Sequence, residues 1–293
     1  MISSPVSNQD FLATVAEKSD GAQLRGDYTH ADSEYVVQQN WAGYSEAEHA
    51  LWRRLYQRQS ALLPGRACDE FIDALQQMDI GAGIPDFAPT SDALFKATGW
   101  RIVAVPGLIP ELTFFTHLAN RRFPVTVWLR KPEEFDYIVE PDVFHDFFGH
   151  VPLLFNPVFA DYMQRYGAGG LKAMKLGGLE QLARLYWYTV EFGLINTKQG
   201  LRIYGAGILS SGGEVEYCLK AGTTSRHIRL DIERCLRTLY KIDSYQETYF
   251  VIDNYQQLFD GTAPDFTPIY EKLKHLDALL ANTLLASEIE LLP

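Results

Sequence analysis

The sequence is poor in cysteine and contains no long apolar run. Its three cysteines, Cys68, Cys218 and Cys235, form neither an even set of disulfide partners nor a metal-binding spacing, so we expect reduced thiols in the cytosol. No apolar stretch reaches 18 residues, and the N-terminus has no basic segment followed by an apolar core. A membrane span and a secretion signal are therefore not expected, and the chain is predicted to be cytoplasmic.

Positive charge is also in short supply. Lys and Arg number 26 against 37 Asp and Glu, which gives a formal net charge of −11. A nucleic-acid partner would call for a basic stripe on the surface. No nucleic-acid partner is therefore expected, and the charge balance is that of an ordinary acidic protein.

Apolar residues are plentiful enough for a large core. Of the 293 residues, 47% are hydrophobic and 22% are charged, which fits one large domain and argues against global disorder. Residues 1–30 are polar and are expected to form a flexible N-terminal arm. Residues 31–293 are expected to form a single domain.

Helical patterns outnumber strand patterns along the chain. Ser45 and Glu48 form a capping box that opens a helix reaching about Leu63. Because strands and helices do not alternate regularly, the predicted class is α+β, predominantly helical with short strands. The patterns predict strands at 100–105, 124–130 and 248–252, helices at 110–121, 156–166, 179–194, 225–239 and 266–286, and a glycine-rich link at 167–178. The last helix lacks sustained heptads, so a monomer or at most a dimer is expected.

Two histidines dominate the chemistry of residues 137–152. His145 and His150 lie five residues apart in a run that is otherwise mostly aromatic or apolar. Neutral imidazole is the commonest metal ligand in proteins, so the pair is a candidate half of a metal site. The ordinary alternative is two hydrogen-bonded histidines in a core.

The spacing of the two histidines limits how they can share an ion. The zinc-protease signature places its histidines four apart, with Glu after the first. Five residues along a straight helix correspond to roughly 140° of rotation. Both rings are expected to reach one ion only if the helix tightens or ends between them, and Gly149 and Pro152 are suited to that break.

Glu191 is the candidate third ligand. It lies in a helical pattern, 179–194, whose second half is apolar nearly all round and is expected to be buried. A buried carboxylate is costly unless it is paired or bound to a metal, and Arg184 is two turns away. A buried ion pair with a distant arginine is the alternative. Together with His145 and His150, Glu191 has the composition of the two-His, one-carboxylate set of non-haem iron enzymes.

Three stretches resemble the pterin-dependent aromatic amino acid hydroxylases, and most closely their bacterial single-domain members. They are Glu-Pro-Asp-Val-Phe-His-Asp-Phe-Phe-Gly-His-Val-Pro, Leu-Tyr-Trp-Tyr-Thr-Val-Glu-Phe-Gly-Leu and Tyr-Gly-Ala-Gly-Ile-Leu-Ser-Ser. The resemblance covers roughly residues 40 to 270, with the motifs in order. It implies the hydroxylase catalytic-domain fold and phenylalanine 4-monooxygenase activity, which forms L-tyrosine from L-phenylalanine with O₂, Fe(II) and tetrahydrobiopterin or a related tetrahydropterin.

The resemblance also implies roles for individual residues. The catalytic iron ligands would be His145, His150 and Glu191. The pterin would lie against Val105, Gly107, Leu108, Ile109 and Phe114, although the residues alone favour plain core packing for Phe114. The amino acid would lie near Arg130, Asp142, His145, Gly207, Ser210 and Glu214. Arg130 would hold its carboxylate, and Glu214 would support Arg130 or the loop at 205–211. A structural salt bridge from Arg130 to Asp142 is the alternative role for the arginine. Animal members have Thr-Pro where Ile138 and Val139 stand, so that wall of the pocket is expected to differ.

Other functions remain open at the level of sequence. Within the family, tryptophan or tyrosine could replace phenylalanine as the substrate. A zinc hydrolase built on the same histidines, or a non-catalytic protein that binds aromatic metabolites, would leave the three motifs unexplained.

Overall fold

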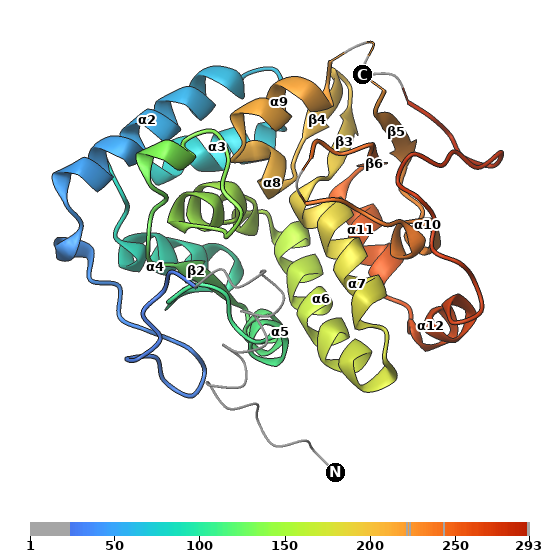
Figure 1. Ribbon diagram of the computed structural model, residues 1–293, viewed down its shortest axis with the longest axis horizontal. Helices are drawn as coiled ribbons and strands as arrows, with labels where there is room; N and C mark the ends of the chain where they lie inside the picture. The colour runs from blue at the N-terminus through green and yellow to red at the C-terminus, as the bar shows by residue number, and fades with distance from the viewer. Residues whose placement is uncertain (1–23, 221, 223, 243, 292–293) are drawn as a thin grey trace.

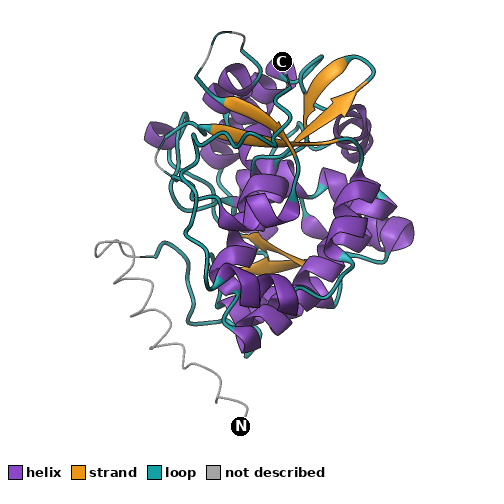
Figure 2. Ribbon diagram, turned by 90° about the vertical axis from the view of Figure 1, so that its right-hand side faces the viewer, coloured by secondary structure: helices purple, strands orange, loops and turns teal. Residues whose placement is uncertain are grey.

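Two small sheets and a surrounding set of helices make up the fold (Figure 1; Figure 2). This computed structural model describes residues 24–220, 222, 224–242 and 244–291. The α-helices are α2 (Glu46–Leu62), α3 (Asp69–Met78), α4 (Phe87–Thr98), α5 (Glu111–Ala119), α6 (Pro157–Leu176), α7 (Leu179–Tyr186), α8 (Ala206–Leu209), α9 (Gly212–Cys218), α10 (Ile232–Arg237), α11 (Tyr255–Thr262) and α12 (Thr267–Leu273). Two π-helices span Phe144–His150 and Trp187–Glu191. The predicted α+β class with helices dominating is confirmed.

The strands form one parallel pair and one mixed sheet. β1 (Arg101–Val105) and β2 (Arg122–Thr126) run parallel, with Arg101 opposite Arg122. The second sheet has the order β4-β3-β6-β5 and contains β3 (Leu194–Thr197), β4 (Gly200–Ile203), β5 (Arg226–Arg229) and β6 (Thr248–Ile252). β6 is buried along its whole length, as expected for a strand paired on both sides.

An aromatic cluster joins α2 and α3 to the first π-helix. Phe144 and Phe148 stack with ring centroids 4.7 Å apart, and the edge of Trp52 meets Phe144 at 5.1 Å. Phe71 packs on Phe148 from α3, and all four of these side chains are fully buried. The π-helix is therefore held by its aromatic face, which leaves its histidines on the other side.

The glycine-rich segment 167–178 is not the link that the sequence suggested, because α6 continues through it to Leu176. A Cβ on Gly167 would overlap Leu118 and Ala119, and one on Gly170 would overlap Phe115. The glycines allow α5 to pack closely against α6. Their role is in helix packing, which a local pattern does not distinguish from a loop.

Two predicted helices were also wrong in part. The segment 225–239 begins as β5, which pairs with β6 from Arg226 to Arg229, and only α10 is helical. The final helix ends at Leu273, after which Leu279 exchanges backbone hydrogen bonds with Arg237 and Leu239. In both places backbone pairing with a distant segment outweighs the local helical pattern.

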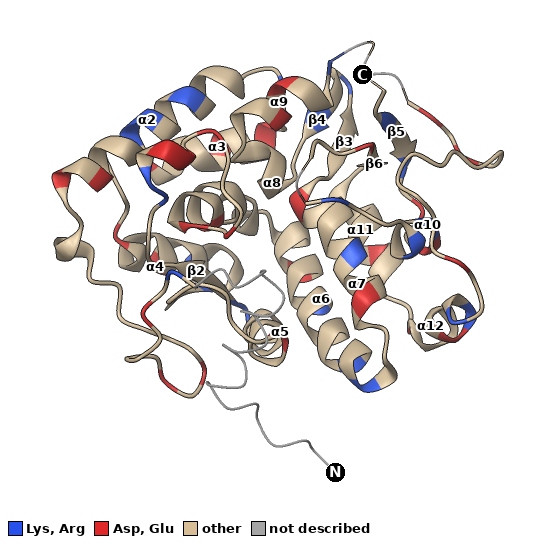
Figure 3. Ribbon diagram, in the orientation of Figure 1, with Lys and Arg blue, Asp and Glu red and all other residues tan. Residues whose placement is uncertain are grey.

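Most of the predicted N-terminal arm, residues 1–23, lies outside the described residues. The remaining part, 24–30, contacts the domain: Tyr28 is buried and Arg25 forms an ion pair with Glu134. Acidic and basic positions are interspersed over the helices in Figure 3. Within the described part of the chain, no helix combines the length and apolar character needed to cross a bilayer.

Replacing Ser45 with Ala tests the predicted capping box. The Ser45 hydroxyl accepts the Glu48 backbone N–H at 3.3 Å, and the Glu48 carboxylate accepts the Ser45 N–H at 2.7 Å. Ser45→Ala should lower the free energy of unfolding by about 1 kcal/mol, measured by urea denaturation. Ser45→Asp, which retains a capping oxygen, should lose much less, and equal stability of all three proteins would contradict the cap.

Candidate metal centre

His145 and His150 lie on one side of the first π-helix. In a π-helix the backbone bonds run from residue i to i+5, so residues five apart stand nearly above one another. The Nε2 atoms of the two rings are 3.2 Å apart. The expectation that the helix tightens or ends between the histidines was therefore wrong: it widens, and the widening matches the five-residue spacing.

Glu191 reaches the same point from the second π-helix, which continues directly from α7. One carboxylate oxygen lies 3.5 Å from His145 Nε2 and the other lies 3.2 Å from His150 Nε2. Arg184 does not pair with Glu191 but with Glu180, one turn earlier on α7. The alternative of a buried arginine pair for Glu191 therefore has no support among the ion pairs of the described residues.

His145 and Glu191 are arranged as acceptors that face each other. Ser210 Oγ donates to the Ala206 carbonyl at 2.9 Å, so it accepts from His145 Nδ1–H, also at 2.9 Å. His145 Nε2 then carries a lone pair toward the carboxylate when the ring is neutral. Two buried acceptors that face each other repel unless a proton or a cation lies between them.

The charges within the group act in opposite directions. Burial alone would lower the pKa of His145, but the charge and hydrogen bond of Glu191, together with the charges of Asp146 and Asp142, outweigh it and the pKa is raised. Burial would likewise raise the pKa of Glu191, yet the two imidazoles hold it well below its usual range. The lowered pKa keeps the Glu191 carboxylate ionised.

This donor set fits a divalent metal ion. The three residues each offer one ligand atom, and these atoms lie within 4.8 Å of one another. Two imidazoles and one carboxylate on one side of an ion leave its remaining coordination positions open, which is the arrangement of non-haem Fe(II) oxygenases. The donor set therefore suits a catalytic iron site with open positions better than a structural metal site whose positions are all filled by the protein.

Arg130 and Asp142 form a buried bidentate pair beside His145. The guanidinium Nε and Nη2 donate to the two carboxylate oxygens at 2.8 and 2.9 Å. The same carboxylate accepts the backbone N–H groups of Arg130 and His145 at 2.9 and 3.0 Å. Burial alone would raise the pKa of Asp142, but Arg130 and these N–H groups keep it lowered. The salt bridge considered from the sequence is therefore present.

The remaining predicted substrate residues lie close to this pair or to the second sheet. Ser210 contacts His145, as described above, and Gly207 packs close to the Phe192 ring and the Glu191 carbonyl. Glu214 accepts hydrogen bonds from the Tyr249 hydroxyl and from the Gln246 backbone N–H. Its partners are therefore in 246–249, and not Arg130.

The predicted pterin residues lie at the end of β1 and on α5. Val105 ends β1, Gly107 and Leu108 follow it, and Ile109 precedes α5. Phe114 is partly buried, and its ring meets the Tyr186 ring edge-on at 5.9 Å. Tyr186 in turn stacks on His150 at 6.2 Å. Phe114 is thus linked to the histidine pair through one intervening aromatic ring.

Two side chains at the centre did not emerge as site residues from the sequence. Asp146 is buried, accepts the Thr126 backbone N–H at 2.8 Å and has a pKa raised by burial. Its position directly after His145 was the available signal. Tyr186 packs on His150, but an aromatic residue in an apolar helix has no distinguishing pattern.

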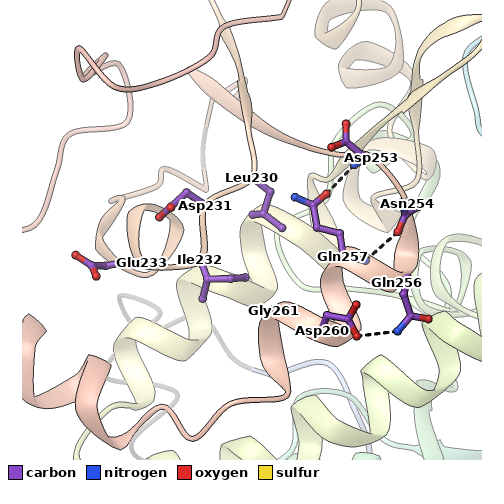
Figure 4. Close-up of a pocket in the computed structure, with 10 residues that line it drawn as sticks. All are labelled: Leu230, Asp231, Ile232, Glu233, Asp253, Asn254, Gln256, Gln257, Asp260 and Gly261. Atoms are coloured by element: carbon purple, nitrogen blue, oxygen red, sulfur yellow. Dashed lines mark hydrogen bonds between the residues drawn. The ribbon is translucent and has the colours of Figure 1, made fainter.

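A broad surface pocket of about 850 Å³ lies elsewhere, between α10 and α11 (Figure 4). Its polar side chains bond locally: Asp231 caps α10, Asn254 caps α11, and Asp260 accepts from Gln256. None of its lining residues is among the predicted site residues, so it offers no alternative location for the chemistry.

Replacing Glu191 with Gln tests the metal site directly. The amide keeps the size of the side chain but removes its negative charge, so the affinity for Co²⁺ or Fe²⁺ should fall by at least about tenfold, measured by anaerobic metal titration. Glu216→Gln, an exposed change on α9, should leave the affinity unchanged. Full metal affinity in Glu191→Gln would remove Glu191 from the ligand set.

Comparison with known proteins agrees with this geometry. The family model described as biopterin-dependent aromatic amino acid hydroxylase matches residues 20–267. Phenylalanine-4-hydroxylase of Ralstonia nicotianae is 59% identical over 259 residues, which cover 88% of this chain and 80% of that protein. Phenylalanine-4-hydroxylase of Chromobacterium violaceum is 59% identical over 246 residues, covering 84% of this chain and 82% of that protein.

Solved structures give the same result. The crystal structure of Chromobacterium violaceum phenylalanine hydroxylase with bound oxidised Fe(III) has a TM-score of 0.87 at 55% identity, and the match covers 90% of this chain and 96% of that one. The cobalt-bound structure of the same enzyme gives 0.87 at 56% identity, over 89% and 95% of the two chains. On these grounds the chain belongs to the biopterin-dependent aromatic amino acid hydroxylases.

Proposed function

We propose that this protein is a phenylalanine 4-monooxygenase, which converts L-phenylalanine to L-tyrosine with O₂, a tetrahydropterin and Fe(II). The observation that carries the proposal is the meeting of His145, His150 and Glu191 at one point, in a chain 56–59% identical to three proteins named phenylalanine-4-hydroxylase. Iron held by these residues, with the reduced pterin beside it, would supply the activation of O₂ that aromatic hydroxylation requires.

The protein's own residues have three tasks in this reaction. His145, His150 and Glu191 hold the metal from one side and leave the other side for reactants. Ser210 and Asp142 fix the first of these ligands through its ring and its backbone N–H. The aromatic side chains behind them are buried, which keeps water away from a reactive oxidant.

Arg130 is proposed to bind the carboxylate of the amino acid. Its Nε–Nη2 edge is occupied by Asp142, so the substrate would be met by Nη1. Arg130 is only 4% exposed, and a charge-assisted bond is strong in such surroundings. Because Asp142 already holds the guanidinium in place, little ordering would be needed when the substrate binds.

The proposal also covers the domain, the compartment and the partners of the protein. Residues 31–293 would act as one catalytic domain in the cytoplasm, as a monomer or at most a dimer, with a small-molecule substrate and no nucleic-acid or membrane partner. The described residues after α12, 274–291, contain no helix, so no coiled coil forms there.

The decisive assay is tyrosine formation from phenylalanine with single omissions. The complete mixture of iron-loaded protein, tetrahydrobiopterin, O₂ and L-phenylalanine should give tyrosine, and leaving out iron, pterin or O₂ should reduce the yield to background. Product analysis by liquid chromatography checks this. In competition, tryptophan and tyrosine should be consumed more slowly than phenylalanine; faster turnover of either would assign a different substrate, and pterin-independent hydrolysis would assign a different class.

A second test concerns the carboxylate clamp. Arg130→Lys keeps the positive charge but loses the planar two-point donor, so the KM for phenylalanine should rise about 10- to 100-fold. The KM for the pterin should change less than about twofold, since the change is at the amino acid. Steady-state kinetics with each substrate varied in turn checks this split.

Arg122→Lys is the matched control for the clamp. Arg122 also forms a two-point pair, with Glu34 at 2.7 and 3.0 Å, but outside the site. It should leave both KM values unchanged. Equal increases in the two KM values for Arg130→Lys would show a general distortion of the site instead of a lost clamp.

A further inference from the structure

The first described residues of the chain lie against the predicted pterin segment. In Figure 1 the blue start of the chain runs alongside β2. Further along, the Val37 backbone N–H donates to the Ala104 carbonyl of β1 at 2.9 Å. We call Arg25–Tyr28 the strap and Val105–Ile109 the pterin loop.

The strap is fixed to the pterin loop at two points. The Tyr28 hydroxyl donates to the Leu108 carbonyl at 2.8 Å, and Tyr28 is only 7% exposed. Two residues earlier, a Cβ on Gly26 would overlap the Pro106 carbonyl. The strap backbone can therefore approach the loop this closely only with glycine at position 26.

The outer end of the strap is held by charge. Arg25 forms a two-point ion pair with Glu134, and its guanidinium lies 5.2 Å from the centre of the Trp128 ring. Trp128 and Glu134 lie on either side of Arg130 in the chain, so the strap connects the pterin loop to the segment that contains Arg130.

The inner side of the strap encloses polar atoms without partners. A Cβ built on Gly107 would lie 2.9 Å from the Tyr28 hydroxyl, 3.0 Å from Glu140 Oε1 and 3.4 Å from Trp128 Nε1. Glu140 Oε1 and Trp128 Nε1 are both buried without a hydrogen-bond partner. Leaving such atoms unpaired is unfavourable. The polar atoms between the strap and the pterin loop therefore indicate a role other than stability alone.

Regular secondary structure does not fix the shape of the loop. Gly107 has a positive φ of 155°, and residues 106–110 belong to no helix or strand. The Leu108 side chain is 39% exposed, so it is free to contact a ligand. A loop that presents its backbone to a ligand binds it more tightly when the loop is held in one conformation beforehand.

We propose that the strap is part of the pterin site, and that Tyr28 is a positioning residue that sets pterin affinity by fixing the Leu108 carbonyl. This inference rests on the proposed function, because it takes the pterin to bind at the loop. Tyr28 acts on the pterin through the loop. By linkage, bound pterin holds the strap closed as strongly as the closed strap favours the pterin.

The chain supplies a closely matched pair of variants for the test. Tyr28→Phe removes the hydroxyl that bonds the Leu108 carbonyl. Tyr44→Phe removes a hydroxyl that bonds the Val127 carbonyl at 2.6 Å, which is the same kind of bond outside the pterin loop. Isothermal titration of the iron-loaded proteins with 7,8-dihydrobiopterin measures binding without turnover.

Tyr28→Phe should raise the Kd for dihydrobiopterin about 3- to 10-fold, the effect of one hydrogen bond, and the KM for the reduced pterin in parallel. The KM for phenylalanine and the iron content should stay within about twofold of wild type. Tyr44→Phe should leave all four unchanged. Gly26→Ala, which pushes the strap off the Pro106 carbonyl, should weaken dihydrobiopterin binding by at least as much as Tyr28→Phe.

Limited proteolysis gives a readout independent of affinity. Trypsin can cut the strap after Arg25, and dihydrobiopterin should slow that cut in wild type but much less in Tyr28→Phe, as followed by mass spectrometry. Unchanged or tighter binding of dihydrobiopterin by Tyr28→Phe would overturn the role of the strap but not the proposed function. An equal loss of dihydrobiopterin affinity in Tyr44→Phe would do the same. Failure of wild type itself to bind dihydrobiopterin would overturn the proposed function as well.

Discussion

The site depends on two places in the chain where the helical hydrogen bonds follow the π-helix pattern instead of the α-helix pattern. His145 and His150 share a side only because their segment is a π-helix, and Glu191 ends a second one. Such a helix bonds its backbone less favourably than an α-helix, so it persists where the surroundings over-determine it. Here a stack of buried aromatic rings, among them Phe144 and Phe148, supports the first π-helix from behind. Much of the core is thus arranged to hold one unusual turn.

The residues of the site were easier to predict than the shape that unites them. Residue type alone, two imidazoles and a carboxylate in apolar surroundings, indicated a metal site. The widened helix could not be inferred, because apolar residues in 144–150 give no sign of the bonding pattern beneath them. Strong local signals, such as the capping box at Ser45, were reliable. Segments whose structure depends on distant partners were predicted wrongly. The glycine-rich part of α6 is helical where it packs against α5, and β5 is a strand because it pairs with β6.

The predicted roles of Arg130 and Glu214 show the same limit. The sequence allowed either a substrate clamp or a structural salt bridge for Arg130, and the observed pair with Asp142 leaves one edge of the guanidinium for a ligand. The two interpretations are therefore compatible. Glu214 was considered as a support for Arg130, but it binds Tyr249 and Gln246. Only the three-dimensional neighbours of a buried acid determine which of its possible partners it meets.

Asp142 has a consequence for where the substrate is oxidised. Its two oxygens fix the Arg130 side chain, the Arg130 backbone and the backbone of His145 at once. In the proposed reaction, Arg130 binds the amino acid and His145 binds the iron, so Asp142 fixes the position of one relative to the other. The separation between them would then determine which ring carbon faces the oxidant. Selectivity for the para position would then depend on the distance between Arg130 and the iron. Asp142 would set that distance without contacting the substrate ring.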